Sequence, residues 1–146
     1  MNSFVDIANL THKSYKKDIE QVLDRAAAQG VRKIVITGAC PNSNREAIAL
    51  AERFQEHQVA LYTTLGIHPH EAVQFNAESA SEILALSQTD TVKAIGETGL
   101  DFYRDFSPRK IQEQAFTEQL AIGAKTGLPV FLHEREAHER FFAILN

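Results

Sequence analysis

Cysteine, glycine, proline and long apolar runs are all scarce in this sequence. The single cysteine, Cys40, excludes a disulfide within the chain and favours a reducing compartment such as the cytoplasm. Only 7 glycines and 4 prolines are present, which excludes a collagen-like or low-complexity polymer. No apolar run approaches the roughly 20 residues of a membrane-spanning helix, so we expect a water-soluble protein with no membrane partner.

Basic residues are also slightly outnumbered. The 146 residues include 15 Lys plus Arg against 19 Asp plus Glu, for a formal net charge of −4, and 44% are hydrophobic. This profile predicts one globular domain rather than a protein that coats duplex DNA with a broad basic face. Nucleic acid is still an acceptable substrate class, because a bound divalent metal can supply positive charge.

Five apolar runs rich in β-branched or aromatic residues alternate with amphipathic helical patterns. The runs are Phe4 to Ile7, Lys33 to Gly38, Ala60 to Ile67, Val92 to Gly96 and Pro129 to His133. Strict alternation predicts an α/β fold with a parallel sheet and outer helices. Five units fall short of a (β/α)8 barrel, so the pattern leaves open a doubly wound sheet and an incomplete barrel. The sequence stops inside an apolar helical pattern, which favours a truncated barrel.

Serine residues mark three expected helix starts. Ser43 and Ser79 each precede a glutamate by three residues, the spacing of a capping box. Ser107 precedes Pro108, which suits the first helical position, and Gly127 is placed to end that helix.

Polar side chains gather where the predicted strands end, which is where parallel α/β folds place their functional sites. They are Asp6 and Asn9 on the first unit, His68 and His70 on the third, Glu97 and Asp101 on the fourth, and His133, Glu134 and Arg135 on the fifth.

Glu97 and His133 are the strongest candidates for metal ligands. They lie at the ends of strands expected to be neighbours, and parallel neighbours are about 4.8 Å apart, so both side chains can reach one divalent ion. A buried Glu–His pair with a structural role fits the spacing equally well.

Three further side chains have more than one interpretation each. His68 and His70 flank a proline and suit metal ligation, phosphate contact or simple loop packing. Arg135 suits a phosphate, but an ion pair with Glu134 or Glu139 fits its position as well.

Cys40 and the glycine-rich stretch at residues 96–99 point to no separate chemistry. No base is indicated next to Cys40, so a small buried thiol is expected there. The stretch GETG matches neither the dinucleotide-binding nor the Walker pattern, which weakens nicotinamide and ATP functions.

Three segments on the third, fourth and fifth predicted strands resemble the TatD family of metal-dependent deoxyribonucleases. They are residues 65–70 (LGIHPH), 95–102 (IGETGLDF) and 129–135 (PVFLHER). The stretch from Phe4 to Thr11 looks like the first strand of that family, and the resemblance covers the whole chain.

The resemblance implies a TIM-type (β/α)8 barrel of the metal-dependent hydrolase kind. Residues 1–146 would be a single TatD-like domain, C-terminally truncated, with the first five βα units. The implied activity is cleavage of phosphodiester bonds in DNA by a 3′-5′ exonuclease acting on single strands or 3′ ends, with one or two ions of Mg2+, Mn2+ or Zn2+.

The resemblance also assigns roles by position. Glu97 and His133 match metal ligands, and Glu97, the catalytic residue, is placed to bridge two ions. His68, His70 and Arg135 match positions near the scissile phosphate, where they would bind substrate. Asp6 matches the first-strand acid.

Relatives continue through three more strands that add a histidine ligand and a catalytic aspartate. The isolated 146 residues are therefore expected to bind metal weakly and to be inactive or nearly so. Two other interpretations stay open: a barrel metallohydrolase acting on cyclic amides or lactones, and a non-catalytic remnant that pairs its sheet edges with a second copy.

Overall fold

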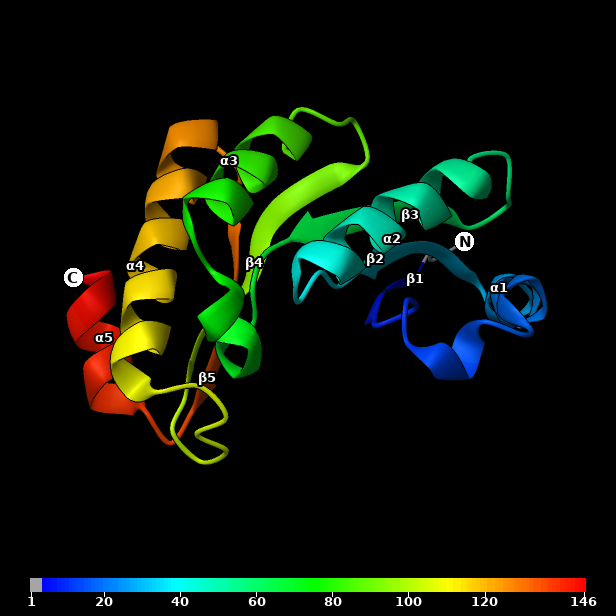
Figure 1. The fold of residues 1–146 in the computed structure, drawn as a ribbon. Helices are drawn as coiled ribbons and strands as arrows, with labels where there is room; N and C mark the ends of the chain where they lie inside the picture. The colour runs from blue at the N-terminus through cyan, green and yellow to red at the C-terminus, as the bar shows by residue number, and fades with distance from the viewer. Residues whose placement is uncertain (1–3) are drawn as a thin grey trace.

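Five parallel strands form one curled sheet in the computed structural model, which describes residues 4–146 (Figure 1). The strands follow one another in chain order across the sheet and are β1 (Phe4–Ala8), β2 (Val31–Ile36), β3 (Ala60–Leu65), β4 (Val92–Asp101) and β5 (Val130–Arg135). This order and curvature are those of a half-barrel, so the incomplete-barrel prediction is confirmed and the doubly wound sheet is wrong.

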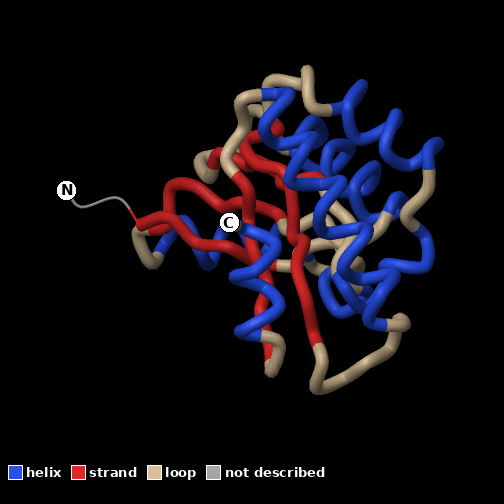
Figure 2. The backbone as a smooth tube through the Cα atoms, turned by 90° about the vertical axis from the view of Figure 1, so that its left-hand side faces the viewer, coloured by secondary structure: helices blue, strands red, loops and turns tan. Residues whose placement is uncertain are grey.

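Helices cover the outer, convex face of the sheet (Figures 1 and 2). They are α1 (Ile19–Ala28), α2 (Pro41–Arg53), α3 (Ala77–Leu86), α4 (Arg109–Thr126) and α5 (His138–Leu145), with short 3-10 helices η1 (Lys13–Tyr15) and η2 (Pro69–Gln74). Over residues 4–146 no helix is both long and apolar enough to cross a membrane.

The hydrophobic core lies between the sheet and this helical layer. Ile34 and Ile36 of β2 pack with Leu23 of α1 and Ala47 of α2, and all four are buried. At the other end of the sheet, Phe116 of α4 stacks on the ring of Phe141 of α5 at a centroid distance of 5.0 Å. These contacts hold α1 and α2 against β2 and join α4 to α5, as expected of a helical layer that covers a parallel sheet.

The concave face of the sheet is open at its first strand. Val5 and Ile7 of β1 are 60% and 52% exposed, because their side chains point away from the packed helices. The strand ends that face this opening carry the polar residues of interest.

The predicted helix caps on serine are wrong in detail. Ser43 and Ser79 occupy the third helical position, and the N-caps are Cys40 and Asn76, each three residues earlier. In each helix the serine hydroxyl accepts the N–H of the N-cap residue, as the glutamate of a capping box would. The serine therefore takes the third position of a helix that begins about one turn earlier than predicted.

The cap predicted at the start of α4 is also wrong. Ser107 is not an N-cap, because the helix begins at Arg109 and the Ser107 hydroxyl donates instead to the carbonyl of His70. The expected end at Gly127 is confirmed, since that glycine takes the left-handed conformation there (φ 72°).

Strand β4 continues five residues past its predicted end at Gly96. A bulge at Glu97 interrupts its pairing with β5, and pairing resumes from Thr98 to Asp101. Gly99 has φ +149°, and a Cβ on it would overlap the carbonyl oxygen of His133. Glycine therefore lets the two strands approach closely beyond the predicted end of β4.

We predict that Gly99→Ala destabilises the protein by at least about 3 kcal/mol, because the added methyl group meets the β5 backbone and alanine is strained at this φ. Gly127→Ala is the matched control: its φ is also positive, but nothing lies within 4 Å of the new Cβ. The control should lose only about 1 kcal/mol. Urea unfolding of both variants measures the difference, and equal losses would contradict the close approach.

Candidate metal centre at the carboxyl ends of the strands

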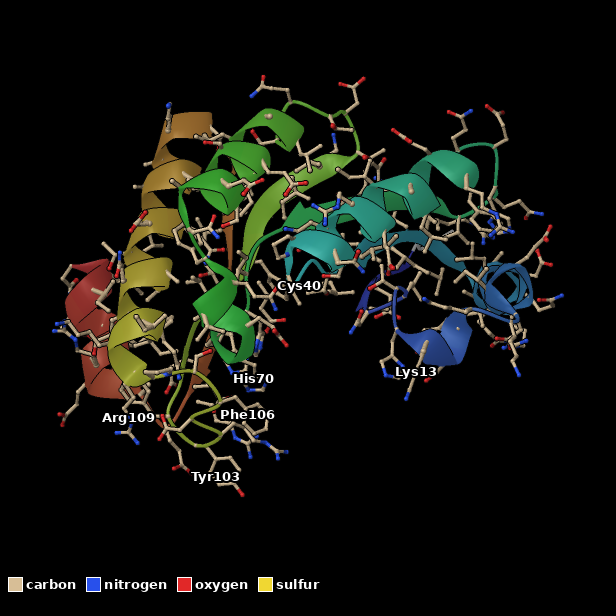
Figure 3. All side chains as sticks on the ribbon, viewed as in Figure 1. Lys13, Cys40, His70, Tyr103, Phe106 and Arg109 are labelled. Atoms are coloured by element: carbon tan, nitrogen blue, oxygen red, sulfur yellow. The ribbon has the colours of Figure 1, made fainter. Side chains whose placement is uncertain are left out.

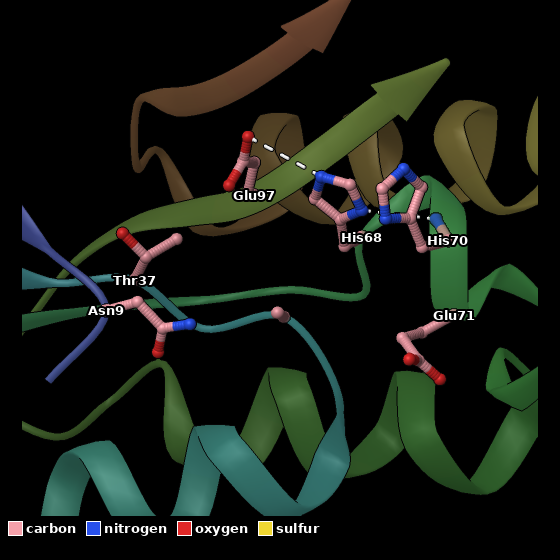
Figure 4. A pocket seen from close by; sticks show the side chains of 7 residues that line it. Asn9, Thr37, His68, His70, Glu71 and Glu97 are labelled. Atoms are coloured by element: carbon pink, nitrogen blue, oxygen red, sulfur yellow. Dashed lines mark hydrogen bonds and ion pairs between the residues drawn. The ribbon is translucent and has the colours of Figure 1, made fainter. Parts of the chain in front are cut away.

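Three histidines and two carboxylates converge at the carboxyl ends of β3, β4 and β5. His68 and His70 come from the turn that opens η2, Glu97 and Asp101 from β4, and His133 from β5. Figure 3 shows His70 on the open side of the curled sheet, and Figure 4 shows His68, His70 and Glu97 together on the wall of a pocket.

The bulge in β4 positions Glu97. Because Glu97 has no ladder partner on β5, its N–H is free to donate to the carbonyl of Gly38, at 2.9 Å, in the loop after β2. This bond ties the bulge to the neighbouring unit of the sheet. The Glu97 side chain then points into the pocket beside His68.

Three donor atoms form a small triangle at this point. The Glu97 Oε1 atom lies 3.1 Å from Nδ1 of His133 and 3.7 Å from Nε2 of His68, and the two ring nitrogens are 3.2 Å apart. A divalent ion about 2.1 Å from each of its ligands holds them roughly 3 to 3.5 Å apart. The Glu97–His133 spacing therefore fits two ligands that share a cation, with Nε2 of His68 beside them.

Asp101 orients two of the imidazoles. Its Oδ2 atom accepts from Nε2 of His70 at 2.7 Å and from Nε2 of His133 at 3.1 Å. The other ring nitrogen of His133, Nδ1, faces Oε1 of Glu97 and donates to it when it carries a proton; a cation bound between the two would replace that proton. A histidine held on one nitrogen by a carboxylate and free on the other is the usual arrangement of a metal ligand.

The hydrogen bonds of His68 assign it a different tautomer. Its Nδ1 accepts the backbone N–H of His70 at 3.1 Å, which leaves the proton of the neutral ring on Nε2. Burial lowers the pKa of His68 to about 4, against the attraction of Glu97 and with the nearby imidazoles adding to the decrease. His68 is thus neutral at pH 7 and presents an N–H donor to the pocket.

The remaining groups of the cluster favour ionised carboxylates. Burial acts to raise the pKa of Glu97, but the hydrogen bond from His133 and the charge of the imidazoles outweigh it and lower that pKa. The hydrogen bond to Glu97 raises the pKa of His133, with burial opposing and Asp101 adding to the increase. The donor set is therefore anionic oxygen plus imidazole nitrogen, which suits a divalent ion.

The pocket beside these residues has a volume of about 320 Å³. It is lined by Asn9, Thr37, Ala39, His68, His70, Glu71 and Glu97. Its walls come from the first four βα units, so the donor triangle lies at one side of an opening large enough for a phosphate group and a sugar.

The sequence profile described as TatD-related DNase matches residues 6–146. The chain belongs to the TatD family.

Curated relatives of this TatD-family chain are named 3′-5′ ssDNA/RNA exonuclease TatD. The one from Pectobacterium carotovorum is 45% identical over 137 residues, and the one from a Pantoea species is 47% identical over the same length. Each match covers 94% of this chain and 52% of the relative. The chain thus spans about half the length of these proteins.

Solved structures of the family share the fold. A TatD family hydrolase from Entamoeba histolytica superposes with a TM-score of 0.90 at 31% identity, over 97% of this chain and 53% of that one. The TatD homologue YJJV of Escherichia coli gives a TM-score of 0.86 at 32% identity, over 97% and 54%. The half-barrel therefore corresponds to about half of a TIM-type barrel of the TatD kind.

The structure brings four of the predicted site residues of this TatD-family chain together. Glu97, His133, His68 and His70 form the cluster described above. Arg135 lies apart from the donor triangle, with its guanidinium 3.8 Å from the centre of the Tyr103 ring.

The alternative of an ion pair for Arg135 is wrong. Within residues 4–146 neither Glu134 nor Glu139 pairs with it, and Glu134 instead accepts the backbone N–H of Ala137.

Asp6 and Cys40 lie outside the cluster. Asp6 is exposed, accepts the N–H of its neighbour Ile7 and does not line the pocket, whereas Asn9 from the same segment does. Asp6 pairs in register with Ile34, whose side chain lies in the core on the helical side. Cys40 is half-buried, and its thiol accepts from the N–H of Ser43 as a helix cap.

Sequence reasoning placed Asp101 at a strand end but assigned it no role. A usable signal was present: Glu97, Gly99 and Asp101 alternate, so a strand that continued past Gly96 would carry both carboxylates on one face. The glycines at 96 and 99 concealed that continuation.

We predict that Asp101→Asn lowers the free energy of unfolding by about 2 kcal/mol at pH 7. Asp101 is 1% exposed, and its carboxylate also accepts the backbone N–H groups of Tyr103 and Arg104; an amide has one acceptor oxygen in place of two. Asp105→Asn, which alters an exposed ion pair with Arg109 in the same loop, is the control and should change stability little.

The effect of Asp101 should depend on pH in a defined direction. Burial acts to raise its pKa, but hydrogen bonds from Arg104, His70 and His133 outweigh burial and lower it to about 2, below the ordinary 3.8. The stabilisation is therefore complete above pH 4 and lost as the pH falls toward 2. Urea unfolding of wild type and Asp101→Asn should converge over that interval; a constant difference would contradict this account.

Proposed function

We propose that this chain carries part of the active site of a metal-dependent nuclease that hydrolyses phosphodiester bonds of single-stranded DNA from the 3′ end. The observation that carries the proposal is the Glu97–His133–Asp101 arrangement, in which one imidazole is held by a buried carboxylate and turned toward a second. The names of the curated relatives support the substrate class.

Glu97 and His133 are the proposed metal ligands. Glu97 offers an ionised oxygen and His133 offers Nδ1, since its Nε2 is bound to Asp101. When bound, a divalent ion lowers the pKa of a water molecule and neutralises charge on the phosphate. We infer Mg2+ or Mn2+, with Zn2+ as the third candidate, because the set mixes oxygen and nitrogen.

His68, His70 and Arg135 are the proposed substrate-binding residues. His68 is neutral and directs its Nε2–H into the pocket, so it can donate to a non-bridging phosphate oxygen. His70 is fixed by Asp101 at the same wall. Arg135 has no carboxylate partner within residues 4–146 and supplies a positive charge for the backbone of the substrate.

Two side-chain ligands hold a hard divalent ion weakly, since such ions take four or more. The 146 residues by themselves should therefore bind metal with low affinity and turn over substrate slowly or not at all. The first-strand role of Asp6 and the cytoplasmic location stay predictions.

We predict that Glu97→Gln weakens Mn2+ binding more than tenfold, because the amide removes the anionic ligand while keeping the shape of the side chain. Isothermal calorimetry of the chain measures the affinity. Glu71→Gln is the matched control: Glu71 lines the same pocket but lies outside the donor triangle, so its variant should bind Mn2+ as the wild type does.

Activity gives a second measurement. In a protein that carries the complete barrel, hydrolysis of bis-p-nitrophenyl phosphate should require Mg2+ or Mn2+ and disappear in Glu97→Gln, whereas cyclic amides and lactones should not be hydrolysed. Unchanged Mn2+ affinity in Glu97→Gln, or hydrolysis of amides in preference to the phosphodiester, would contradict the proposal.

A further inference from the structure

The loop after β4, residues 102–107, presents two large aromatic rings to solvent. Tyr103 is 53% exposed and Phe106 is 65% exposed; Figure 3 shows Phe106 next to His70 and Tyr103 at the lower end of the same loop. The Phe106 ring packs edge-on against the His70 ring at a centroid distance of 4.9 Å, which leaves most of its surface free. Exposed apolar surface next to a polar site marks a binding site, in this case for a ligand that has an apolar face.

Two guanidinium groups lie on these rings. Arg135 lies 3.8 Å from the centre of Tyr103, and Arg104 lies 5.8 Å from Tyr103 and 5.9 Å from Phe106. Neither arginine side chain forms an ion pair within the part of the chain that the structure describes. The nearby acid Asp105 is already paired with Arg109. The loop therefore combines free positive charge with exposed aromatic faces.

Hydrogen bonds hold the loop backbone that carries the two rings. Asp101 accepts the N–H groups of Tyr103 and Arg104 at 3.2 and 2.8 Å, and the Ser107 hydroxyl donates to the carbonyl of His70. Gln112 from α4 donates to the carbonyl of Ser107 at 2.8 Å. A platform fixed in this way loses little conformational entropy when a ligand binds.

We infer that Tyr103 and Phe106, with Arg104 and Arg135, form a base-stacking platform for unpaired nucleotides next to the scissile phosphate; this rests on the proposed nuclease function. Aromatic rings bind bases through their π-faces, and guanidinium groups bind the intervening phosphates. Only a single strand offers its base faces in this way, because in a duplex they are covered by stacking. The platform thus selects single-stranded over duplex substrate.

Binding of fluorescent oligothymidylate to the chain, measured by anisotropy with chelator present, tests the platform without any metal. We expect Phe106→Ala and Tyr103→Ala each to weaken binding about tenfold, the loss of one stacking contact. Phe142→Ala is the matched control, since Phe142 of α5 is 49% exposed and also packs against a histidine, His138, at 4.7 Å. Its variant should bind as the wild type does.

Two further probes separate stacking from phosphate binding. An oligonucleotide with abasic sites keeps the phosphates but offers no base to either ring, so wild type should bind it about a hundredfold more weakly and Phe106→Ala should add no further loss. The chain contains no tryptophan, so Phe106→Trp introduces a single indole whose emission should be quenched by oligothymidylate. This variant retains a stacking ring and also shows that the loop tolerates substitution.

The inference is overturned if Phe106→Ala binds oligothymidylate as wild type does, or if bases and abasic sites are bound equally well. A blunt duplex bound as tightly as the single strand also contradicts it. Mn2+ calorimetry on wild type and Phe142→Ala separates this failure from failure of the proposed function. If the wild type does not bind Mn2+ but Phe106→Ala still weakens oligothymidylate binding, the metal site alone is refuted. If the wild type binds Mn2+ but Phe106→Ala leaves oligothymidylate binding unchanged, the platform alone is refuted.

Discussion

The buried carboxylate of Asp101 joins the histidine cluster to the loop that follows β4. One of its oxygens accepts from the rings of His70 and His133, and the other accepts from the backbone of Tyr103 and Arg104. Because a buried charge is stable only when it is fully hydrogen-bonded, all four donors are held in one arrangement. The orientation of a proposed metal ligand and the position of the proposed stacking rings therefore have the same cause.

The geometry of β4 makes this connection possible. The bulge at Glu97 turns that side chain into the pocket and the strand then resumes, so that Asp101 follows on the same side four residues later. Gly99 lets β5 approach closely enough for His133 to reach both carboxylates. A side chain at Gly99 would separate the strands that carry the ligands. Bulges next to functional sites often serve to redirect a side chain in this manner.

Electrostatics in this chain is local rather than global. The formal net charge is −4, which disfavours broad attraction to nucleic acid. Positive charge is instead concentrated where the substrate is proposed to bind, on Arg104 and Arg135, with a metal ion expected at Glu97 and His133. Such an arrangement suits recognition of one chain end at one site more than binding along a duplex.

The sequence by itself determined the alternation of strands and helices, the family, and the strand ends at which the polar residues cluster, because β-branched runs, polar strand ends and the IGETGLDF segment are local signals. It did not determine the continuation of β4 past Gly96, since the need for glycine at position 99 becomes visible only from the close approach of β5. Only the tertiary structure decided that Asp101 accepts hydrogen bonds both from the histidine rings and from the loop backbone, that Arg135 stacks on Tyr103, and that Asp6 points to the helical side. Each depends on register between strands distant in sequence, which no local pattern encodes.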